Sequence, residues 1–473
     1  MKKNIKSVSR RKFVKDLAGA GIAATAFPYL ALAGTGKKQV ILEPEHNPFA
    51  EKKFAANDKI RVGVIGAGII GFYNMVSALS VNGTEIAAVC DLYDGRLTHV
   101  REVHGKDIAI TKNYHDILSR PDIDVVLIAT PDHWHDRITV DAMKAGKPIY
   151  CEKPMVQEIS EGHKVLDAEK QYKAKFQVGS QGVSSIIIKK AHDLYKAGEI
   201  GELITVEAAY DRHSSLGAWQ YSIPPDASPQ TIDFDTFLGD TPKVAFDPIR
   251  FFRWRNYQAY GTGIAGDLFV HLFSWTHRII DSIGPVKIYG SGGTRYWKDG
   301  RDVPDILTCV VDYGKQDSHP AFNMQIRVNF TAGGGGEGSL SLVGSEGTLK
   351  YVNGNLELYK APFPNKPEYG GYDSLFTFSE AMQKQFVDDY NRKYYDVAAD
   401  LNEPAELTFK APEGYDDRNS HWANLIAAIR DGKPIVENAT YGLRAAGPSL
   451  SANQSYFKKQ IINWDPVNMN VIS

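Results

Sequence analysis

The sequence contains few cysteines for its length. Three occur in 473 residues, namely Cys90, Cys151 and Cys309, and they lie far apart in apolar segments. Disulfide frameworks and cysteine-based metal sites need cysteines at close and recurring spacings. We therefore expect three buried thiols, no disulfide and no metal site.

The chain also lacks an excess of charge of either sign. Its 54 Lys and Arg residues are balanced by 56 Asp and Glu residues, which gives a formal net charge of −2. Proteins that bind nucleic acid or anionic membranes by charge carry basic patches or tails, so we expect no nucleic-acid partner. Because single hydrophobic cores stop growing near ~250–300 residues, this length predicts two or more globular domains.

No apolar run near the N-terminus is long enough to span a membrane. Residues 17–32 are uncharged but fall short of the roughly 20 residues that a spanning helix needs. The Arg10-Arg11 pair precedes this run, and small residues suited to cleavage end at Ala33. This order predicts a signal peptide over residues 1–36, and residues 9–15 resemble the twin-arginine signature. We expect folded export to the periplasm without membrane insertion after cleavage; the alternative is a basic amphipathic tail.

The next part of the chain divides into a linker and an α/β domain. Residues 37–58 mix charges and prolines without a clear period, which predicts a surface linker. Apolar strand-like segments then alternate with helical segments, and such alternation is typical of a parallel sheet covered on both faces. We predict a doubly wound Rossmann domain over residues 59–181, with strands at residues 59–66, 84–91, 124–131, 148–154 and 176–182.

Residues 182–473 show a different pattern. Their strand-like segments alternate polar and apolar residues and are separated by turns that contain glycine. This predicts an α+β domain with a large, mostly antiparallel sheet that has one open face. Because an exposed sheet face usually needs a partner, we expect a homodimer or homotetramer formed through this sheet. Residues 420–460 return to a helical pattern, in which Ser420 and Gly432 are expected to cap a helix.

A glycine motif follows the first predicted strand. Residues 66–71 match G-x-G-x-x-G, and Asp91 ends the next strand, twenty residues after Gly71. Such a turn lets backbone N–H groups approach a pyrophosphate, while the carboxylate binds ribose hydroxyls. We predict bound NAD in preference to NADP, because a 2′-phosphate would face the charge of Asp91; the alternative is a plain tight turn. The expected contacts are Gly66, Gly68, Ile69, Ile70, Gly71 and Asp91.

Two further motifs lie at the carboxyl ends of predicted strands, where open α/β sheets bind ligands. They are ATPDHWH at residues 129–135 and CEKPM at residues 151–155. A lysine at this edge places three N–H donors in the crevice, where they can polarise a hydroxyl. Asp132 and the two histidines can instead be a cap and polar loop residues. The expected cofactor contacts in these motifs are Thr130, Pro131, His133, His135, Glu152 and Lys153.

These motifs, together with Asp-x-x-x-His at Asp267 and His271, resemble the Gfo/Idh/MocA oxidoreductase family from residue 59 to the end of the chain. The resemblance implies that His271 takes the proton of a sugar hydroxyl and that Lys153 hydrogen-bonds the same oxygen. It implies that Asp267 binds a neighbouring hydroxyl and orients the histidine. It also implies hydride transfer to nicotinamide and, often, a cis peptide bond before Pro154. Gln181 is a further expected cofactor contact, implied only by this resemblance.

Aromatic and hydrogen-bonding side chains near residues 210–221 and 250–263 suit a carbohydrate substrate. A sugar stacks its apolar face on aromatic rings, and its hydroxyls need donors and acceptors. The alternative for each aromatic residue is structural packing. The candidate substrate contacts are His213, Arg253, Trp254 and Tyr260.

We therefore expect a periplasmic NAD-dependent carbohydrate oxidoreductase. It would move a hydride between a tightly bound NAD and a secondary hydroxyl of a sugar or glycoside, with C3 of a glucoside as one candidate. Tight binding is expected because no pool of free NAD exists outside the inner membrane. Two alternatives remain open: a redox-neutral NAD-dependent glycosidase of the same superfamily, and a catalytically silent sugar-binding protein.

Overall fold

The structure is a computed structural model that describes residues 39–43, 55, 58–397 and 405–472. The expected signal peptide lies outside the described residues. The chain divides into two compact units, one of residues 40–358 and 408–473 and one of residues 1–39 and 359–407. The second unit contains α11 (Glu380–Lys393). The parallel sheet, the candidate site and most of the second sheet belong to the first unit.

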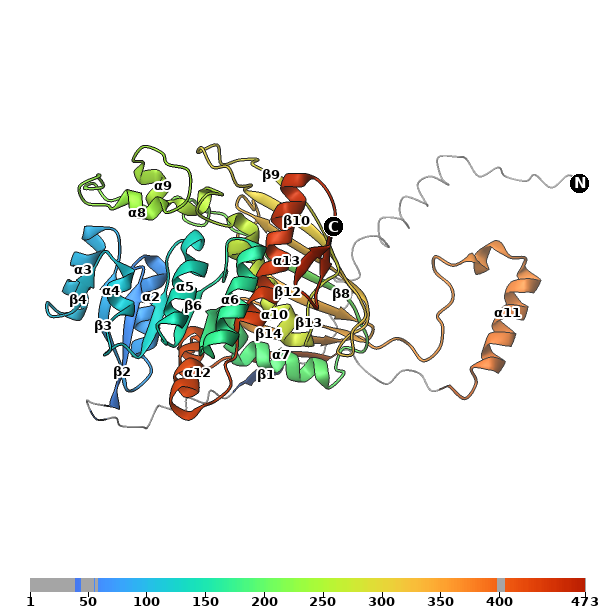
Figure 1. The fold of residues 1–473 in the computed structure, drawn as a ribbon. Helices are drawn as coiled ribbons and strands as arrows, with labels where there is room; N and C mark the ends of the chain where they lie inside the picture. The colour runs from blue at the N-terminus through green and yellow to red at the C-terminus, as the bar shows by residue number, and fades with distance from the viewer. Residues whose placement is uncertain (1–38, 44–54, 56–57, 398–404, 473) are drawn as a thin grey trace, which may run out of the picture. The chain divides into compact units, whose positions relative to one another are not determined.

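The N-terminal domain contains a six-stranded parallel sheet in the order β4-β3-β2-β5-β6-β7, which confirms the predicted doubly wound architecture (Figure 1). The residues of β5 are fully buried, because helices cover both faces of a parallel sheet. The strands are β2 (Ile60–Ile65), β3 (Thr84–Cys90), β4 (Ala109–Thr111), β5 (Val125–Ile128), β6 (Ile149–Glu152) and β7 (Phe176–Gly179). The helices between them are α2 (Ile69–Leu79), α3 (Asp94–His104), α4 (Tyr114–Leu118), α5 (His135–Lys144) and α6 (Ile159–Tyr172).

The second sheet has eleven strands among the described residues, in the order β1-β15-β14-β13-β12-β8-β11-β10-β9-β16-β17. Its pairs are mostly antiparallel, with β8 and β11 parallel. Side chains of β11 alternate between buried and exposed, so one face is open, as predicted. The strands are β1 (Gln39–Leu42), β8 (Leu203–Tyr210), β9 (Lys287–Gly293), β10 (Ile306–Tyr313), β11 (Phe322–Asn329), β12 (Gly338–Gly344), β13 (Gly347–Val352), β14 (Asn355–Lys360), β15 (Ala405–Lys410), β16 (Ile462–Asp465) and β17 (Asn470–Ile472).

Helices cover one face of this sheet. Figure 1 shows α7 (Ile186–Lys196), α10 (Val270–Ile280) and α13 (Ala439–Lys458) between the sheet and the N-terminal domain. The prediction that residues 37–58 form a linker is wrong at residues 39–42, which form the edge strand β1. The sequence pattern of a four-residue strand is too short to be distinguished from that of a loop.

Helix α12 (Asp417–Asp431) returns to the N-terminal domain although it lies far along the chain. The ring of Trp422 stacks on Tyr150 with centroids 4.6 Å apart, and its indole N–H donates to Asn74 Oδ1. Apolar side chains of α12 join the core formed by β2 and β5. The domain boundary at residue 181 is therefore not a single point in the sequence.

The caps of α12 were predicted only in part. The left-handed C-cap at Gly432 is confirmed, with φ of +64°. The N-cap at Ser420 is wrong, because the helix begins three residues earlier and the Asp416 carboxylate accepts from the backbone N–H of Arg418. A carboxylate at the N-cap also suits the positive end of the helix dipole.

A segment of the second domain, residues 219–260, lies over the carboxyl ends of the strands of the parallel sheet. We call this segment the strap. It contains the short helices α8 (Phe234–Leu238) and α9 (Pro248–Phe252), which Figure 1 places beside α3. Tyr93 forms a bridge with Ile232, and its hydroxyl donates to Asp226 over 2.6 Å. Aromatic side chains of the strap and Tyr93 form their own buried cluster. The strap therefore closes one side of the crevice at the carboxyl ends of the strands.

All three cysteines are buried and free, as predicted. Within the described ranges, no helix combines the length and the apolar character that crossing a membrane requires.

Candidate active site

The three glycines of the turn after β2 have different roles: two are required by the fold, and one leaves room for a ligand. Gly66 has φ of +97°, and a Cβ there would lie 2.5 Å from the carbonyl oxygen of Ala129. A Cβ on Gly71 would lie 2.1 Å from the carbonyl oxygen of Gly66. A Cβ on Gly68 would meet no atom nearer than Arg96, at 3.9 Å. The first and third glycines are thus required by the fold, whereas the second keeps space open above the N-terminus of α2.

A cleft begins at this turn and fits a dinucleotide. Its wall on the parallel-sheet side includes Asp91, whose carboxylate accepts from the backbone N–H of Ala67 over 2.8 Å. The Thr130 hydroxyl is buried and has no hydrogen-bond partner among the described residues, which leaves it for a ligand. The strap supplies the opposite wall. The predicted contacts that line the cleft are Gly66, Gly68, Ile69, Ile70, Asp91, Thr130 and Pro131, and the strap adds Phe251, Phe252 and Trp254.

His133 and His135 do not line this cleft. Both ring nitrogens of His135 lie near backbone carbonyl oxygens, of Pro154 at 2.7 Å and of Thr130 at 2.9 Å. His133 is held in the same way by Tyr260 and Phe237. Burial lowers the pKa of each ring to about 4. In this structure the two histidines therefore connect loops, and their predicted contacts with the cofactor stay predictions.

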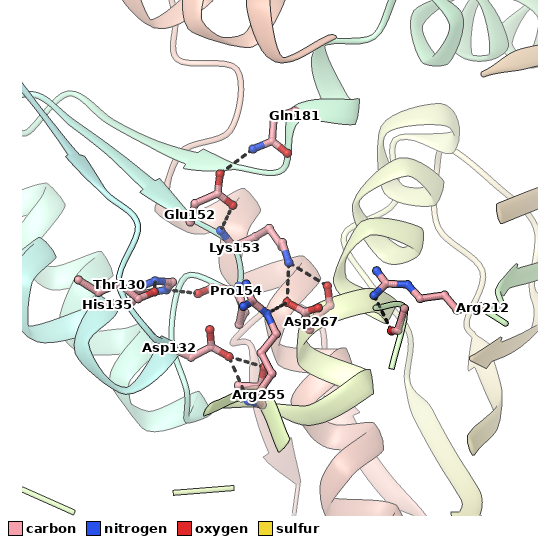
Figure 2. Close-up of polar contacts among 12 residues, drawn as sticks. Thr130, Asp132, His135, Glu152, Lys153, Pro154, Gln181, Arg212, Arg255 and Asp267 are labelled. Atoms are coloured by element: carbon pink, nitrogen blue, oxygen red, sulfur yellow. Dashed lines mark hydrogen bonds and ion pairs between the residues drawn. The ribbon is translucent and has the colours of Figure 1, made fainter. Parts of the chain in front are cut away.

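Lys153 and Asp267 meet at the end of β6 (Figure 2). Lys153 Nζ donates to Asp267 Oδ1 over 2.8 Å and to the carbonyl oxygen of Asp267 over 3.0 Å. Arg255 Nε lies 3.3 Å from the same carboxylate oxygen. The Lys153–Pro154 peptide bond is cis, as the resemblance implied. Residues 114 positions apart thus form one ion-paired cluster, and Lys153 retains a third N–H donor.

Asp267 lies in a π-helical turn, Ala265–Phe269, immediately before α10. Such turns are rare and are found often at functional sites. Asp267 is not a helix N-cap, because it lies inside the helical segment. His271 follows on α10, and its ring lies beside Tyr210 and Trp275, at centroid distances of 6.2 Å and 5.9 Å.

The surroundings of Asp267 and His271 set the charge states of these two side chains. Burial would raise the pKa of the Asp267 carboxyl, but the charges of Lys153 and Arg255 hold it well below its ordinary value. Burial, reinforced by the charge of Lys153, lowers the pKa of His271 to about 3. At neutral pH the site therefore holds an ionised carboxylate and a neutral imidazole.

Glu152 and Gln181 support the strand end that carries Lys153. Gln181 Nε2 donates to Glu152 Oε1 over 2.7 Å, and Asn74 Nδ2 donates to the same oxygen over 2.8 Å. Gln181 also donates to the Tyr150 hydroxyl over 2.9 Å. Burial raises the pKa of Glu152. These predicted cofactor contacts bind one another in the structure and act as a scaffold below Lys153.

The four candidate substrate contacts do not lie together. Trp254 lines the dinucleotide cleft, and Arg253 binds the carbonyl oxygen of Tyr221 and the side chain of Gln220. Tyr260 is 1% exposed and lies inside the aromatic cluster of the strap, so the structure gives it a packing role instead of a substrate contact. His213 is exposed and lines a separate hollow.

Asp132 is a further buried carboxylate near the cluster. It accepts from the backbone N–H of Thr262 over 3.0 Å and from the Thr262 hydroxyl over 2.7 Å. Burial, together with the nearby charge of Asp267, raises the pKa of Asp132 to about 7. Asp132 is not the cap of its own short helix, Asp132–Trp134, whose N-cap is Pro131. Its carboxylate instead ties the end of β5 to the turn before the π-helix.

This raised pKa predicts a pH-dependent stability. The carboxyl ionises near pH 4 in the unfolded chain and near pH 7 in the folded chain, so its contribution to stability is lost as the pH rises through this window. Asp132→Asn keeps an acceptor for Thr262 but cannot ionise. We expect the Tm of the variant, relative to the wild type, to increase between pH 5 and pH 8 in thermal unfolding scans. A Tm difference that stays constant across this range would contradict the assignment.

Comparisons with known proteins agree with this geometry. Residues 60–180 match the model of a family described as an oxidoreductase family with an NAD-binding Rossmann fold, GFO_IDH_MocA. A glycosyl hydrolase family 109 protein of Shewanella baltica is 32% identical over 216 residues, which are 43% of this chain and 46% of that protein. An inositol 2-dehydrogenase of Salmonella paratyphi B is 28% identical over 181 residues, 38% of this chain and 52% of that protein. These matches span about half the length of the two relatives.

A solved structure of levoglucosan dehydrogenase, in complex with NADH and levoglucosan, has the same fold. The TM-score is 0.62 at 16% identity, over 86% of this chain and 99% of that one. Fold and cleft define a Rossmann-type dinucleotide-binding protein with a second α+β domain. Residues 60–180 form an NAD-binding Rossmann domain that matches the model of this family.

Proposed function

We propose that the protein is an NAD-dependent oxidoreductase that acts on a secondary hydroxyl of a sugar or glycoside. One observation carries the proposal: Lys153 Nζ lies 2.8 Å from the ionised Asp267 carboxylate, which Arg255 links to the wall of the dinucleotide cleft. A neutral imidazole, His271, lies one helical turn further along. The inositol and levoglucosan dehydrogenases among the similar proteins support a polyhydroxylated substrate.

Each residue of the cluster has a chemical task. When bound, NAD would supply the nicotinamide ring that accepts the hydride from the carbinol carbon of the sugar. The neutral ring of His271 accepts the hydroxyl proton, and the third N–H of Lys153 stabilises the oxygen as negative charge develops on it. Asp267 is held ionised by two cations, so its free lone pairs accept from a neighbouring hydroxyl. Arg255 is a positioning residue, because it holds the Asp267 carboxylate without needing to touch the substrate.

The strap supports a tightly retained cofactor. It is anchored to the N-terminal domain through Tyr93 and Asp226, and the guanidinium of Arg96 lies over the Phe252 ring, 5.4 Å from its centroid. A dinucleotide on the glycine turn would lie against this aromatic wall, which would add apolar contacts to its binding. Tight retention fits the proposed export of the folded protein to the periplasm, which residues 1–36 would direct. Assembly through the open face of the large sheet belongs to the same proposal.

A second candidate is a redox-neutral glycosidase that oxidises and then reduces the same sugar. The similarity of 216 residues to a glycosyl hydrolase family 109 protein favours it. Both functions use the same cluster, and they differ in whether the sugar leaves in oxidised form. C3 of a glucoside is a position where a ketone would acidify the neighbouring C–H and permit elimination.

A substrate panel tests the proposal. The purified protein is denatured to measure released NAD(H), and native protein is incubated with glycosides and an artificial electron acceptor, with products identified by mass spectrometry. A product that has lost two hydrogens supports the oxidoreductase. A released aglycone without net oxidation supports the glycosidase. No released NAD(H) and no product would overturn both and leave a sugar-binding protein.

A further inference from the structure

A second hollow lies outside the dinucleotide cleft, where β8 and the turn after β13 come together. Its volume is about 590 Å³, within the roughly 300–1,000 Å³ typical of small-molecule sites. We call it the distal hollow. The lining residues used below are Tyr210, Arg212, His213, Trp275, Tyr351 and Asn353.

The distal hollow shares a wall with the catalytic cluster. The rings of Tyr210 and Trp275 line it, and both lie beside the ring of His271. Figure 2 shows Arg212 across Asp267 from Thr130 and Asp132. The cluster therefore lies between two binding spaces, with the dinucleotide cleft on one side and the distal hollow on the other.

The side chains around the distal hollow suit a neutral polyhydroxylated ring. Tyr351 packs edge-on against Trp275 with centroids 5.3 Å apart, which provides an aromatic corner against which the C–H face of a sugar can stack. His213 and Asn353 are exposed at the rim and offer donors and acceptors for hydroxyl groups.

The two carboxylates that line the hollow are each paired with a cation, and Arg212 is a single cation that is hydrogen-bonded to the backbone. Asp211 forms an ion pair with Arg327 over 2.6 Å, and Glu337 lies 3.7 Å from Lys350. Arg212 donates to the carbonyl oxygen of Gly217 over 3.0 Å. A phosphate or carboxylate would find no free cluster of cations here, whereas a sugar needs none.

We infer that the distal hollow binds the second ring of a glycoside whose first ring is oxidised at the Lys153–Asp267 cluster. The inference rests on the proposed function and narrows its substrate class. The substrate is a disaccharide or a glycoside with a ring-shaped aglycone, and a free monosaccharide fills only part of the site.

Binding measurements test the distal hollow independently of catalysis. Isothermal titration calorimetry compares cellobiose, maltose and trehalose with glucose, using the wild type, Tyr351→Ala and Asn353→Gly. Gly at position 353 keeps the left-handed backbone, φ of +50°, while removing the side chain. Tyr296→Ala, at a tyrosine that is 63% exposed elsewhere, is the control. We expect at least one disaccharide to bind more tightly than glucose, and each hollow variant to weaken that binding by about 2- to 10-fold, the loss of one stacking contact, with glucose unchanged.

The outcomes separate this inference from the proposed function. Disaccharides that bind no better than glucose, or hollow variants that lose no more affinity than Tyr296→Ala, overturn the distal hollow as a subsite. If the protein oxidises sugars in that case, the proposed function is still supported. Disaccharide binding that depends on Tyr351, without any oxidised or cleaved product, supports the hollow and overturns the proposed function.

Discussion

Lys153→Met is expected to lower kcat by about 10²- to 10⁴-fold while the cofactor stays bound. This range is the usual contribution of a residue that manages the proton in the transition state. Methionine keeps most of the length of the side chain but removes the N–H donors to Asp267 and to the substrate oxygen. Arg255 still neutralises the Asp267 carboxylate, so the variant is expected to fold. The measurement is single-turnover reduction of bound NAD by a sugar that the panel identifies.

The control for this prediction is Lys144→Met on α5. Lys144 is exposed and pairs only with Asp141 of its own helix among the described residues, so its loss should leave kcat unchanged. Content of NAD(H) after denaturation should be the same in both variants and the wild type. A Lys153 variant that keeps more than a tenth of the wild-type kcat would show that this amine does not assist the reaction.

Gly68→Ala is expected to abolish cofactor binding with little effect on folding, whereas Gly71→Ala is expected to destabilise the protein. Gly68 has φ of −79° and open space around its Cβ position, so alanine fits the fold but occupies the space for the pyrophosphate. A methyl group at Gly71 would meet the carbonyl oxygen of Gly66 at 2.1 Å, and overpacking of this kind costs about 1–3 kcal/mol.

Two measurements distinguish these variants. Denaturant unfolding of cofactor-free protein should give Gly68→Ala the wild-type midpoint and Gly71→Ala a lower one. Released NAD(H) should be absent from purified Gly68→Ala. If Gly68→Ala retained the cofactor at the wild-type level, the pyrophosphate could not lie on this turn.

The parallel sheet and the glycine turn were predictable because their signals are local. Buried strands such as Val125–Ile128 are continuous apolar runs, and the turn needs glycine at Gly66 and Gly71 for steric reasons that hold in any chain. The pairing of Lys153 with Asp267 was accessible only through the resemblance. Nothing in the spacing of residues 114 positions apart indicates that they touch.

Other parts of the site depend on contacts that pattern does not encode. Arg255 belongs to a run of arginines and aromatics in which only the fold shows which guanidinium meets Asp267. His133 and His135 were expected at the cofactor because polar residues at strand ends usually face the crevice. In the structure, both rings are hydrogen-bonded to backbone carbonyl oxygens. The return of α12 to the first domain depends on contacts such as the stacking of Trp422 on Tyr150, which chain order does not indicate.

A crystal structure of the protein purified with its cofactor tests the central claim most directly. We predict electron density for the pyrophosphate on the Gly66–Gly71 turn and for the nicotinamide ring within contact of Lys153 or His271. Density that places the ring beyond the reach of both side chains would contradict the account.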